Sequence, residues 1–424
     1  MTLDHAGVEV LRAEFPALWE MHQDRPLIFF DGPGGTQVHR SVIDAMGQYF
    51  EKSNSNAHGV FLHSRRTDEI TYLARTAVMK FLNASRPEEI VLGPNMTTLT
   101  FRVSQAIGER LGPGDEVVVT RLDHDANISP WTALQRRGVA IQWVDFNPAD
   151  CTLDMTAVAQ AITKRTKLVA MGYASNAVGT INDVRTVVEL ARSVGAWTSV
   201  DAVHYAPHGP IDVSAMDCDF LVCSAYKFFG PHVGILYGRY HLLDDLPAMK
   251  VLPAGNEPPE KFETGTHNFE GISSTLAAID YLASVGQRFG DGDSESFARP
   301  SGLRQNLVSG MTAIRTYEKA LCARLLEGLR GISGLRVYGL VDPENLDRRV
   351  PTVSVTSDRF PPEEVARRLD HENIFVWHGH FYAVSAVERL GLLDHGGLVR
   401  IGLCHYNTVQ EVEILLDVLR RMHS

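Results

Sequence analysis

The feature that most constrains the fold is an alternation of short β-rich runs with helical patterns over most of the first 280 residues. Several runs are apolar on both faces, which is typical of parallel strands covered by helices. A strand followed by a helix, repeated along the chain, indicates βαβ units. We therefore predict an α/β protein with a mostly parallel sheet. The predicted strands are 27–31, 89–92, 116–120, 141–145, 168–173, 197–201, 220–223 and 234–237, with helices such as 68–82, 98–111 and 183–194 between them.

The pattern changes after a segment rich in Gly, Ser and Asp, residues 286–302, which predicts a linker or loop. We therefore predict a large domain over 27–285 and a smaller α+β domain formed by 303–424 together with 1–26. The elements predicted for the small domain are helices 313–329, 362–371 and 408–421 and strands 335–338, 352–355, 374–377 and 399–402.

Composition excludes several classes of protein. The formal net charge of the 424-residue chain is −11, which argues against non-specific binding to nucleic acid or to anionic membranes. The five cysteines form no C-x-x-C pair, so neither a disulfide framework nor a thiolate metal site is predicted. Neither a signal peptide nor an apolar run of about 20 residues is found, so we expect a cytoplasmic protein.

Reactive side chains follow the predicted strands at their carboxyl ends, where an open parallel sheet binds its ligands. Because these ends meet at one edge of the sheet, we expect the side chains to lie together. They combine hydroxyls at the start of a helix, imidazoles, an amide, carboxylates and an amine. In chain order they are Thr97 and Thr98, Asp123 and His124, Asn176, Asp201 and His204, and Ser224 and Lys227.

One small molecule fits this set, namely pyridoxal 5′-phosphate (PLP), an aromatic phosphate ester that carries an aldehyde. Its phosphate binds N–H groups and hydroxyls at a helix N-terminus. Its aldehyde forms a Schiff base with an amine. Its pyridinium nitrogen pairs with a carboxylate, which keeps the nitrogen protonated and makes the ring an electron sink. The sequence therefore predicts PLP as the cofactor and no metal.

The order of the motifs resembles the class V aminotransferase family of fold-type I PLP enzymes, and within it the cysteine desulfurases and their desulfurase-like relatives. The resemblance spans nearly the whole chain and implies a large domain with a mostly parallel sheet and a smaller C-terminal domain. Its most specific segments are DHDANISPW (123–131) and SAYKFFGPHVGILYG (224–238). The other matching segments are FFD (29–31), GT (35–36), NSNAH (54–58), TT (97–98), SNAVGT (175–180), DAVH (201–204), FETGTHN (262–268) and VRIGLCHYN (399–407).

The resemblance implies a role for each matching residue around the cofactor. Lys227 forms the Schiff base, Asp201 pairs with the pyridinium nitrogen, and His124 stacks on the ring. By the same resemblance, the phosphate is bound by Thr97, Thr98 and Ser224. Asn176 and His204 contact the side of the ring that carries the 3-oxygen, and Tyr226 lies next to the lysine.

Further implied contacts concern the substrate and a second subunit. Thr266 is expected to reach the phosphate of the neighbouring subunit's cofactor, which implies a homodimer with active sites at the interface. Arg400 is expected to bind the carboxylate of an amino-acid substrate, since a guanidinium offers paired donors. His58 is expected at the entrance, and Trp377 beside the substrate side chain.

In desulfurases of this group, a segment Arg-x-Gly-His-His-Cys carries the cysteine whose thiolate accepts sulfur from the substrate. The present sequence departs from the desulfurase pattern in this segment. The matching stretch here is WHGHFY (377–382), so Tyr382 stands at the cysteine position and Trp377 at the arginine position. A phenol with a pKa near 10 is a poor sulfur acceptor beside a thiolate. The sequence therefore favours relatives that lack the persulfide cysteine. Tyr226 and His204 also replace the usual His and Gln.

Several reactions remain open for a PLP enzyme with this set of residues. Lys227 is the candidate base for removal of the Cα proton, and Tyr382 or His380 is the candidate second acid. We expect first a C–S or C–Se β-lyase acting on cysteine or a cysteine conjugate. The alternatives are an amino-acid epimerase resembling isopenicillin N epimerase, an aminotransferase, and a decarboxylating or oxidative enzyme.

Three rival classes fit the sequence less well. A dinucleotide-binding dehydrogenase needs G-x-G-x-x-G after the first strand, and the stretch DGPGG (31–35) lacks that spacing. A metal hydrolase could use His378 and His380, but no convincing third ligand follows at a helical spacing. A non-catalytic scaffold would not need the lysine, the aspartate and the stacking histidine together.

Overall fold

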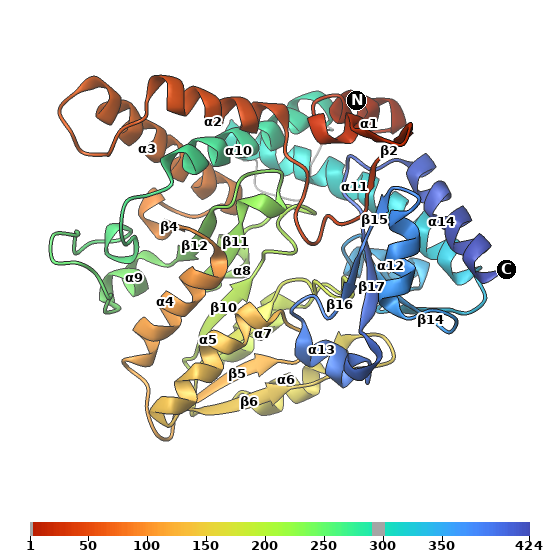
Figure 1. Ribbon diagram of the computed structural model, residues 1–424. Helices are drawn as coiled ribbons and strands as arrows, with labels where there is room; N and C mark the ends of the chain where they lie inside the picture. Colours follow the sequence, from red (N-terminus) through yellow and green to blue (C-terminus); the bar gives the residue numbers. More distant parts are fainter. Residues whose placement is uncertain (1–2, 291–301) are drawn as a thin grey trace.

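Runs that are apolar on both faces form a seven-stranded sheet at the centre of the computed structural model, which describes residues 3–290 and 302–424 (Figure 1). Six of its strands are parallel, and β12 is antiparallel to both of its neighbours. The predicted α/β class with a mostly parallel sheet is confirmed. In spatial order the strands are β4 (Ile90–Gly93), β12 (Gly234–Gly238), β11 (Phe220–Ser224), β10 (Trp197–Asp201), β9 (Thr166–Gly172), β5 (Glu116–Thr120) and β6 (Ala140–Val144).

Helices cover both faces of this sheet. On β5, Val117 and Val119 pack into the core below one face, whereas Val118 packs into the core below the other. Each fully buried side chain of this size contributes roughly 1.5–3 kcal/mol. One face carries α4 (Met96–Gly108), α5 (Ser129–Thr132) and α9 (Tyr240–Asp245), and the other carries α3 (Leu62–Leu82), α7 (Val184–Ser193), α8 (Val213–Met216) and α10 (Phe269–Phe289).

A second, antiparallel sheet of four strands forms the smaller part of the molecule, in blue tones in Figure 1. Its own core joins the sheet to three helices. The strands, in order, are β13 (Leu335–Tyr338), β14 (Thr352–Ser357), β17 (Leu398–Gly402) and β16 (Trp377–Gly379), and the helices are α11 (Leu303–Arg330), α12 (Pro362–Asp370) and α14 (Val409–His423).

The first predicted strand, 27–31, does not join the central sheet. Instead β3 (Ile28–Phe29) pairs in parallel with β15 (Ile374–Phe375), and Asp31 forms a bridge to Gly402 of β17. Phe30 is fully buried in the core of the small sheet. A short apolar run shows that a segment is buried, but not which core buries it. Residues 27–31 therefore lie with the small sheet rather than in the predicted large domain.

Two other predicted boundaries differ from the structure. Helix α10 continues to Phe289, so residues 286–289 of the predicted linker 286–302 are helical, because apolar positions of that stretch pack in the core. Residues 291–301 of that linker lie outside the described residues. Helix α11 begins at Leu303, ten residues before the predicted start at 313. The predicted strand 374–377 is divided between β15 and β16, which belong to different sheets.

The N-terminal segment contacts both parts of the molecule rather than the small one alone. Phe15, just after α1 (His5–Arg12), packs edge-on against Phe229 and Tyr281 of the larger part. Arg12 forms an ion pair of 2.8 Å with Glu411 of α14. Residues 3–26 therefore bridge the two parts.

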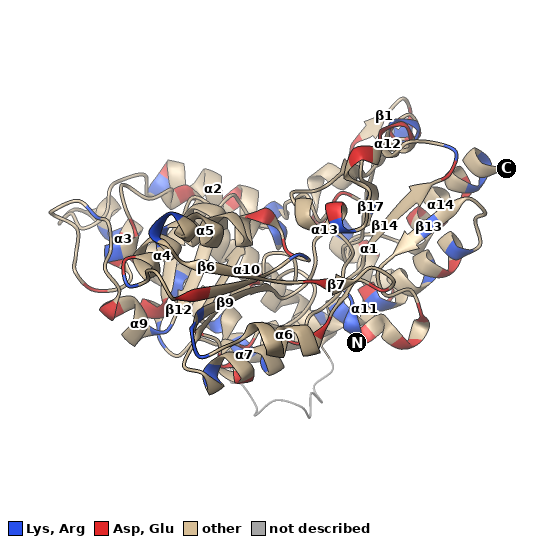
Figure 2. Cartoon of the chain, turned by 90° about the horizontal axis from the view of Figure 1, so that it is seen from below, with Lys and Arg blue, Asp and Glu red and all other residues tan. Residues whose placement is uncertain are grey.

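The remaining elements are short or lie at the surface. Acidic and basic residues are interspersed over both parts (Figure 2). Among the helices of residues 3–290 and 302–424, none has the length and apolar character needed to span a bilayer. These elements are α2 (Arg40–Lys52), α6 (Met155–Ala161), α13 (Val384–Arg389), β1 (Met21–His22), β2 (Arg25–Pro26), β7 (Phe146–Asn147) and β8 (Thr152–Leu153).

Candidate active site

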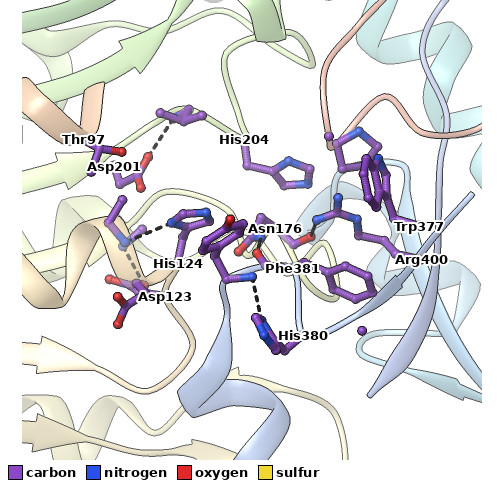
Figure 3. Close-up of a pocket in the computed structure, with 18 of the residues that line it drawn as sticks. Thr97, Asp123, His124, Asn176, Asp201, His204, Trp377, His380, Phe381 and Arg400 are labelled. Carbon is purple, nitrogen blue, oxygen red and sulfur yellow. Dashed lines mark hydrogen bonds between the residues drawn. The ribbon is translucent and has the colours of Figure 1, made fainter. Parts of the chain in front are cut away.

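A cavity of about 1170 Å³ lies at the carboxyl ends of the central strands, between the two parts of the molecule (Figure 3). It is larger than the roughly 300–1,000 Å³ that is usual for a single small ligand. It therefore has room for a cofactor together with a substrate. The predicted site residues in its wall are Thr97, His124, Asn176, Asp201, His204, Ser224, Tyr226, Lys227, Trp377, His380, Tyr382 and Arg400.

Lys227 stands in a short 3₁₀ turn (Ala225–Lys227) that directly follows β11. Its side chain is buried, and its Nζ donates to the carbonyl oxygens of Pro33 and Gly34, the latter at 3.1 Å. Burial, assisted by the charge of Arg400, lowers the pKa of Lys227 to about 7. A large fraction of the amine is therefore neutral at neutral pH, and this is the form that attacks an aldehyde or accepts a proton.

Asp201 is the last residue of β10, next to β11 in the sheet. Burial raises its pKa to about 6, while the N–H of Val203, which donates to its Oδ1 at 2.9 Å, and the charge of Lys227 act in the opposite direction. The carboxylate is ionised at neutral pH and has capacity for a further donor, such as a pyridinium N–H.

Two neutral imidazoles line the cavity. His124 caps a turn by accepting the N–H of Ala126 on its Nδ1 at 3.0 Å. Burial lowers the pKa of His124 to about 4, with contributions from Lys227 and Arg400. Burial also holds the pKa of His204 well below its ordinary value. Both rings can therefore stack or form hydrogen bonds at pH 7 without adding a positive charge.

The start of α4 offers an anion site beside these groups. Asn95 caps the helix by accepting the N–H of Thr98 at 2.8 Å, and Ser224 accepts the N–H of Met96 on its Oγ at 3.2 Å. Free N–H groups and the helix dipole favour a phosphate at such a position. Thr97 and Ser224 reach the cavity, whereas Thr98 is not among the residues of its wall.

Arg400 reaches the cavity from β17 of the small sheet. Its Nη1 donates to the carbonyl oxygen of Asn176 at 3.0 Å, and its guanidinium lies 4.3 Å from the centre of the Phe381 ring. Burial lowers its pKa to about 9, so the group stays charged at neutral pH. No carboxylate of the described residues is hydrogen-bonded to this buried guanidinium, so it is suited to bind the carboxylate of a substrate.

Residues 380–382, here named the strap, connect β16 to the loops of the central sheet. The N–H of Asp125 donates to the carbonyl oxygen of Tyr382 at 2.7 Å, and Asn176 Nδ2 donates to that of Phe381 at 2.8 Å. The Tyr382 ring stacks on His124 at a centroid distance of 5.5 Å. Phe381 and Tyr382 both have positive φ, 53° and 58°, which non-glycine residues rarely adopt. The strap therefore holds its shape through its contacts with the central sheet.

Besides Thr98, two further predicted site residues lie outside the cavity of their own chain. His58 is 82% exposed, and its backbone N–H donates to the carboxylate of Asp68 at 3.0 Å. Thr266 is exposed and does not line the cavity. The role predicted for Thr266 concerns the neighbouring subunit, and it stays a prediction.

Two carboxylates, Asp123 in the cavity wall and Asp31 near Lys227 and Arg400, were given no role toward the cofactor by the sequence, although Asp123 was among the residues expected at the strand ends. Asp123 is buried in the cavity wall and accepts hydrogen bonds from Thr120, Asn127 and Gly172 at 2.8–2.9 Å. Burial raises its pKa to about 7. Asp31 lies close enough to Lys227 and Arg400 for their charges to act on it, although burial still raises its pKa to about 6. Asp31 and Asp123 both lie in segments that carry the family resemblance. Their location in these segments is the sequence signal that could have identified them as site residues.

The five cysteines are all buried, and none belongs to the wall of the cavity. Cys223 precedes the cavity residue Ser224, and burial raises its thiol pKa. Cys404, which lies near Gly32, likewise has a pKa well above its ordinary value because it is buried. Thiols of this kind are protonated and unreactive at neutral pH.

The residues of the cavity fit the predicted cofactor and its substrate. Asp31 Oδ1, Asn176 Oδ1 and Arg400 Nε are buried and have no hydrogen-bond partner among the described residues. An unpaired buried polar atom costs about 1–3 kcal/mol, and two of these three residues, Asn176 and Arg400, belong to the cavity wall, where a ligand can supply a partner. The amine, the carboxylate and the helix N-terminus supply the three groups that PLP needs. Residues 3–290 and 302–424 contain no cluster of three or more His, Cys, Asp or Glu that could hold a metal ion.

The comparisons with known proteins agree with this geometry. Residues 28–291 and 305–415 match the profile of the Aminotransferase class-V family. The chain is 30% identical to a protein named "Probable cysteine desulfurase" from Streptomyces coelicolor, over 98% of this chain and 97% of that one. It is also 30% identical to a "Cysteine desulfurase" from Serratia proteamaculans, over 98% of each chain.

Solved structures show the same architecture. The cysteine desulfurase of Thermococcus onnurineus superimposes with a TM-score of 0.85 at 28% identity, over 98% of each chain. A cysteine desulfurase of Escherichia coli does so with a TM-score of 0.81 at 25% identity, again over 98% of each. The chain therefore belongs to the class V aminotransferase family, and it is a PLP-dependent enzyme related to the cysteine desulfurases.

Proposed function

We propose that the chain is a C–S β-lyase that cleaves cysteine or an S-substituted cysteine without forming a persulfide. The observation that carries this proposal is the chemistry of the cavity wall, which combines the residues of a PLP site with Tyr382 at the strap and with no cysteine. The names of the relatives support a sulfur-containing amino acid as substrate. A lyase releases sulfur as a free thiol, so it needs no acceptor cysteine.

The proposed contacts with PLP follow the groups described above. The start of α4, with Thr97 and Ser224, would hold the phosphate, and Asp201 would hold the ring nitrogen. His124, Asn176, His204 and Tyr226 complete the cofactor wall. When bound, the cofactor supplies an electron sink for the carbon that loses its proton.

Arg400 and Lys227 would perform the first steps on the substrate. Arg400 binds the α-carboxylate through N–H groups on the cavity side and thereby fixes the orientation of Cα. The amine of Lys227 removes the Cα proton, because its pKa of about 7 leaves it largely unprotonated above neutral pH. This base contributes typically 10²–10⁴-fold to the rate of such a step.

Tyr382 or His380 would assist departure of the sulfur. Both line the cavity, and the N–H of Tyr382 donates to His380 Nδ1 at 3.1 Å, which holds the two residues together. A hydroxyl or imidazolium proton delivered to the sulfur makes the leaving group a neutral thiol. Overall, one water is consumed, the Cβ–S bond breaks, and the products are pyruvate, ammonia and a thiol, or hydrogen sulfide when cysteine itself is the substrate.

We also propose a homodimer in which Thr266 serves the neighbouring site. The loop 54–61, α2 and α3 present large exposed apolar side chains to solvent, which a partner surface would cover. They include Phe50, Val60, Phe61, Leu62 and Tyr72. We further propose that the protein is cytoplasmic and that its substrate is an amino acid.

The proposal is tested by incubating the PLP-loaded protein with cysteine, S-methylcysteine, S-benzylcysteine and an S-aryl cysteine. We expect pyruvate and thiol in equal amounts from at least one of them, and neither from the Lys227→Ala variant. Formation of alanine from cysteine would instead indicate desulfuration and would contradict the proposal. Solvent deuterium at an inverted Cα would indicate an epimerase, and a keto acid that retains the sulfur would indicate a transaminase.

A further inference from the structure

An aromatic side chain lies beside the proposed carboxylate-binding group in the wall of the cavity. In the antiparallel pair of β16 and β17, Trp377 is directly opposite Arg400. Side chains at opposite positions of such a pair point to the same face of the sheet, with their Cβ atoms about 5 Å apart. Figure 3 shows these two side chains next to each other. The indole of Trp377 is therefore adjacent to the guanidinium that is proposed to bind the α-carboxylate of the substrate.

The same indole contacts the segment that is bonded to the amine of Lys227. A Cβ added at Gly34 would collide with Nε1 of Trp377, so the indole rests against the backbone of Gly34. The carbonyl oxygen of Gly34 in turn accepts a hydrogen bond from Lys227 Nζ at 3.1 Å. An amino acid bound between the guanidinium and the amine therefore has the indole within reach of its Cβ substituent.

The indole carries apolar surface that the rest of the chain does not cover. Trp377 is 52% exposed although it belongs to the wall of a cavity, whereas tryptophan is on average a largely buried residue type. It lies on β16, which is the last strand of its sheet. Apolar surface of this kind within a binding cavity is typical of a contact with a ligand. Flat rings stack on an aromatic face more favourably than the buried area alone predicts.

The charges of the wall do not suit an anionic substituent on the sulfur. Among the wall residues that the structure describes, Lys227 and Arg400 are the only lysine or arginine. The first is proposed to bind the cofactor and the second the α-carboxylate. No further lysine or arginine of this wall remains for a second carboxylate on the substrate, so an uncharged substituent fits better.

The start of α12 continues the wall and is also mainly apolar. This helix packs beside β16, and Pro361 and Pro362 at its beginning line the cavity. The carboxylate of Glu363 lines the cavity as well, but it already has a cationic partner in Arg367 at 2.5 Å. A cationic substituent is therefore not favoured here either.

We propose that Trp377 is a specificity-determining residue that stacks on an aromatic ring attached to the sulfur of the substrate. The preferred substrates are then S-benzyl and S-aryl cysteines rather than cysteine itself. This inference rests on the proposed function, because the position of the substituent follows from an amino acid whose carboxylate is bound at Arg400.

Carboxylic acids without the α-amine test this contact without any reaction, because they cannot join the cofactor aldehyde. The two probes are 3-(benzylthio)propanoate and 3-(cyclohexylmethylthio)propanoate, whose substituents are apolar and similar in size but differ in having a flat ring. Calorimetric titration of the PLP-loaded protein measures the Kd of each. We expect the benzyl compound to bind more tightly by roughly 3- to 10-fold.

Substitutions of Trp377 identify the indole as the cause of this preference. Trp377→Leu keeps an apolar side chain but removes the flat face, so the two Kd values should become equal. Trp377→Phe keeps a flat ring and should retain most of the preference. Trp19→Leu makes the same change at a tryptophan that is 61% exposed and outside the cavity wall, and it should behave as wild type. Because Trp377 is half exposed on an edge strand, its variants are expected to fold, and thermal unfolding checks this.

A kinetic readout follows from the same contact. In Trp377→Leu, kcat/KM for S-benzylcysteine should fall by roughly 3- to 10-fold, the factor expected for the loss of stacking, whereas kcat/KM for S-methylcysteine should change little.

The outcomes separate this inference from the proposed reaction. Equal Kd values in the wild type, or a benzyl preference that persists in Trp377→Leu, would overturn the inference even if the protein cleaves cysteine. Tighter binding of the dianionic 3-(carboxymethylthio)propanoate than of the benzyl compound would overturn it as well. A benzyl preference that depends on Trp377, in a protein that cleaves none of the cysteine derivatives, would overturn the proposed reaction and leave the inference standing.

Discussion

At the scale of single residues, the site contains titratable groups whose pKa values lie closer to 7 than usual because the groups are buried. The pKa of Lys227 falls to about 7, and those of Asp201 and Asp31 rise to about 6. Such opposite shifts within one cavity are typical of catalytic sites. The sequence identified Lys227 and Asp201 by their places after strands, but it could not predict the shifts, because they depend on burial by segments far away in the chain.

These shifts predict how lyase activity depends on pH. Raising the pH through about 7 removes the proton from the Lys227 amine, and raising it through about 6 ionises Asp201, so both changes increase activity. We therefore expect kcat at saturating substrate, where the substrate has displaced the Lys227 amine, to rise from pH 5 to pH 8, with its half-point between 6 and 7. The measurement is a pH–rate profile with one substrate and constant ionic strength. A profile that is flat over this range would contradict the assignment of Lys227 as base.

The proposed acid role of Tyr382 gives a second prediction. Replacing Tyr382 by Phe removes the hydroxyl and keeps the ring that stacks on His124. We expect kcat to fall by about 10²-fold for an S-alkyl cysteine, whose thiolate is strongly basic and needs a proton to leave. For an S-aryl cysteine, whose thiolate is a better leaving group, the loss should be much smaller. Tyr240→Phe, at the first residue of α9 and outside the cavity wall, is the control. Equal losses for both substrates would indicate a packing role for Tyr382.

At the scale of elements, the strands of the central sheet were the most predictable part of the fold. The bounds of β5 and β10 are those predicted from the sequence, because turn residues flank apolar runs of the usual strand length. The strap could not be predicted, since the left-handed backbone at Phe381 and Tyr382 depends on bonds to Asn176 and Asp125. Likewise, pairing of β3 with β15 joins segments far apart in sequence, and no local pattern records it.

The N-terminal cap of α4 is expected to link the stability of the protein to its affinity for the cofactor. Asn95→Ala removes the side-chain acceptor for the N–H of Thr98, which costs about 1 kcal/mol of unfolding free energy. The same change loosens the helix start that is proposed to hold the phosphate, so the Kd for PLP should rise. Chemical unfolding and titration with PLP measure the two effects. Asp154→Ala, which uncaps α6 outside the cavity, should lower stability without changing the Kd.

At the scale of the whole molecule, the site is proposed to need two copies of the chain. A charge at position 266 should repel the phosphate of the neighbouring cofactor, so Thr266→Asp alone is expected to be inactive. Lys227→Ala alone is also expected to be inactive. In a mixed dimer, one site carries both changes and the other carries neither. Random mixing should therefore restore about a quarter of the wild-type activity.

The measurement is lyase activity after the two variants are mixed, unfolded and refolded together. Mixing either variant with itself is the control and should give no recovery. Absence of recovery in a mixture that contains hybrid dimers would place Thr266 outside the neighbouring site. Activity in Thr266→Asp alone would show that this residue does not approach the phosphate.

The turn after β3 joins the two parts of the molecule at the amine itself. Asp31 is bridged to Gly402 of the small sheet, and a side chain at Gly402 would collide with Pro33. Two residues later, the backbone oxygens of Pro33 and Gly34 accept hydrogen bonds from the Lys227 amine. The four residues 31–34 therefore tie the position of the small sheet to the carbonyl groups that orient the reactive nitrogen of the lysine.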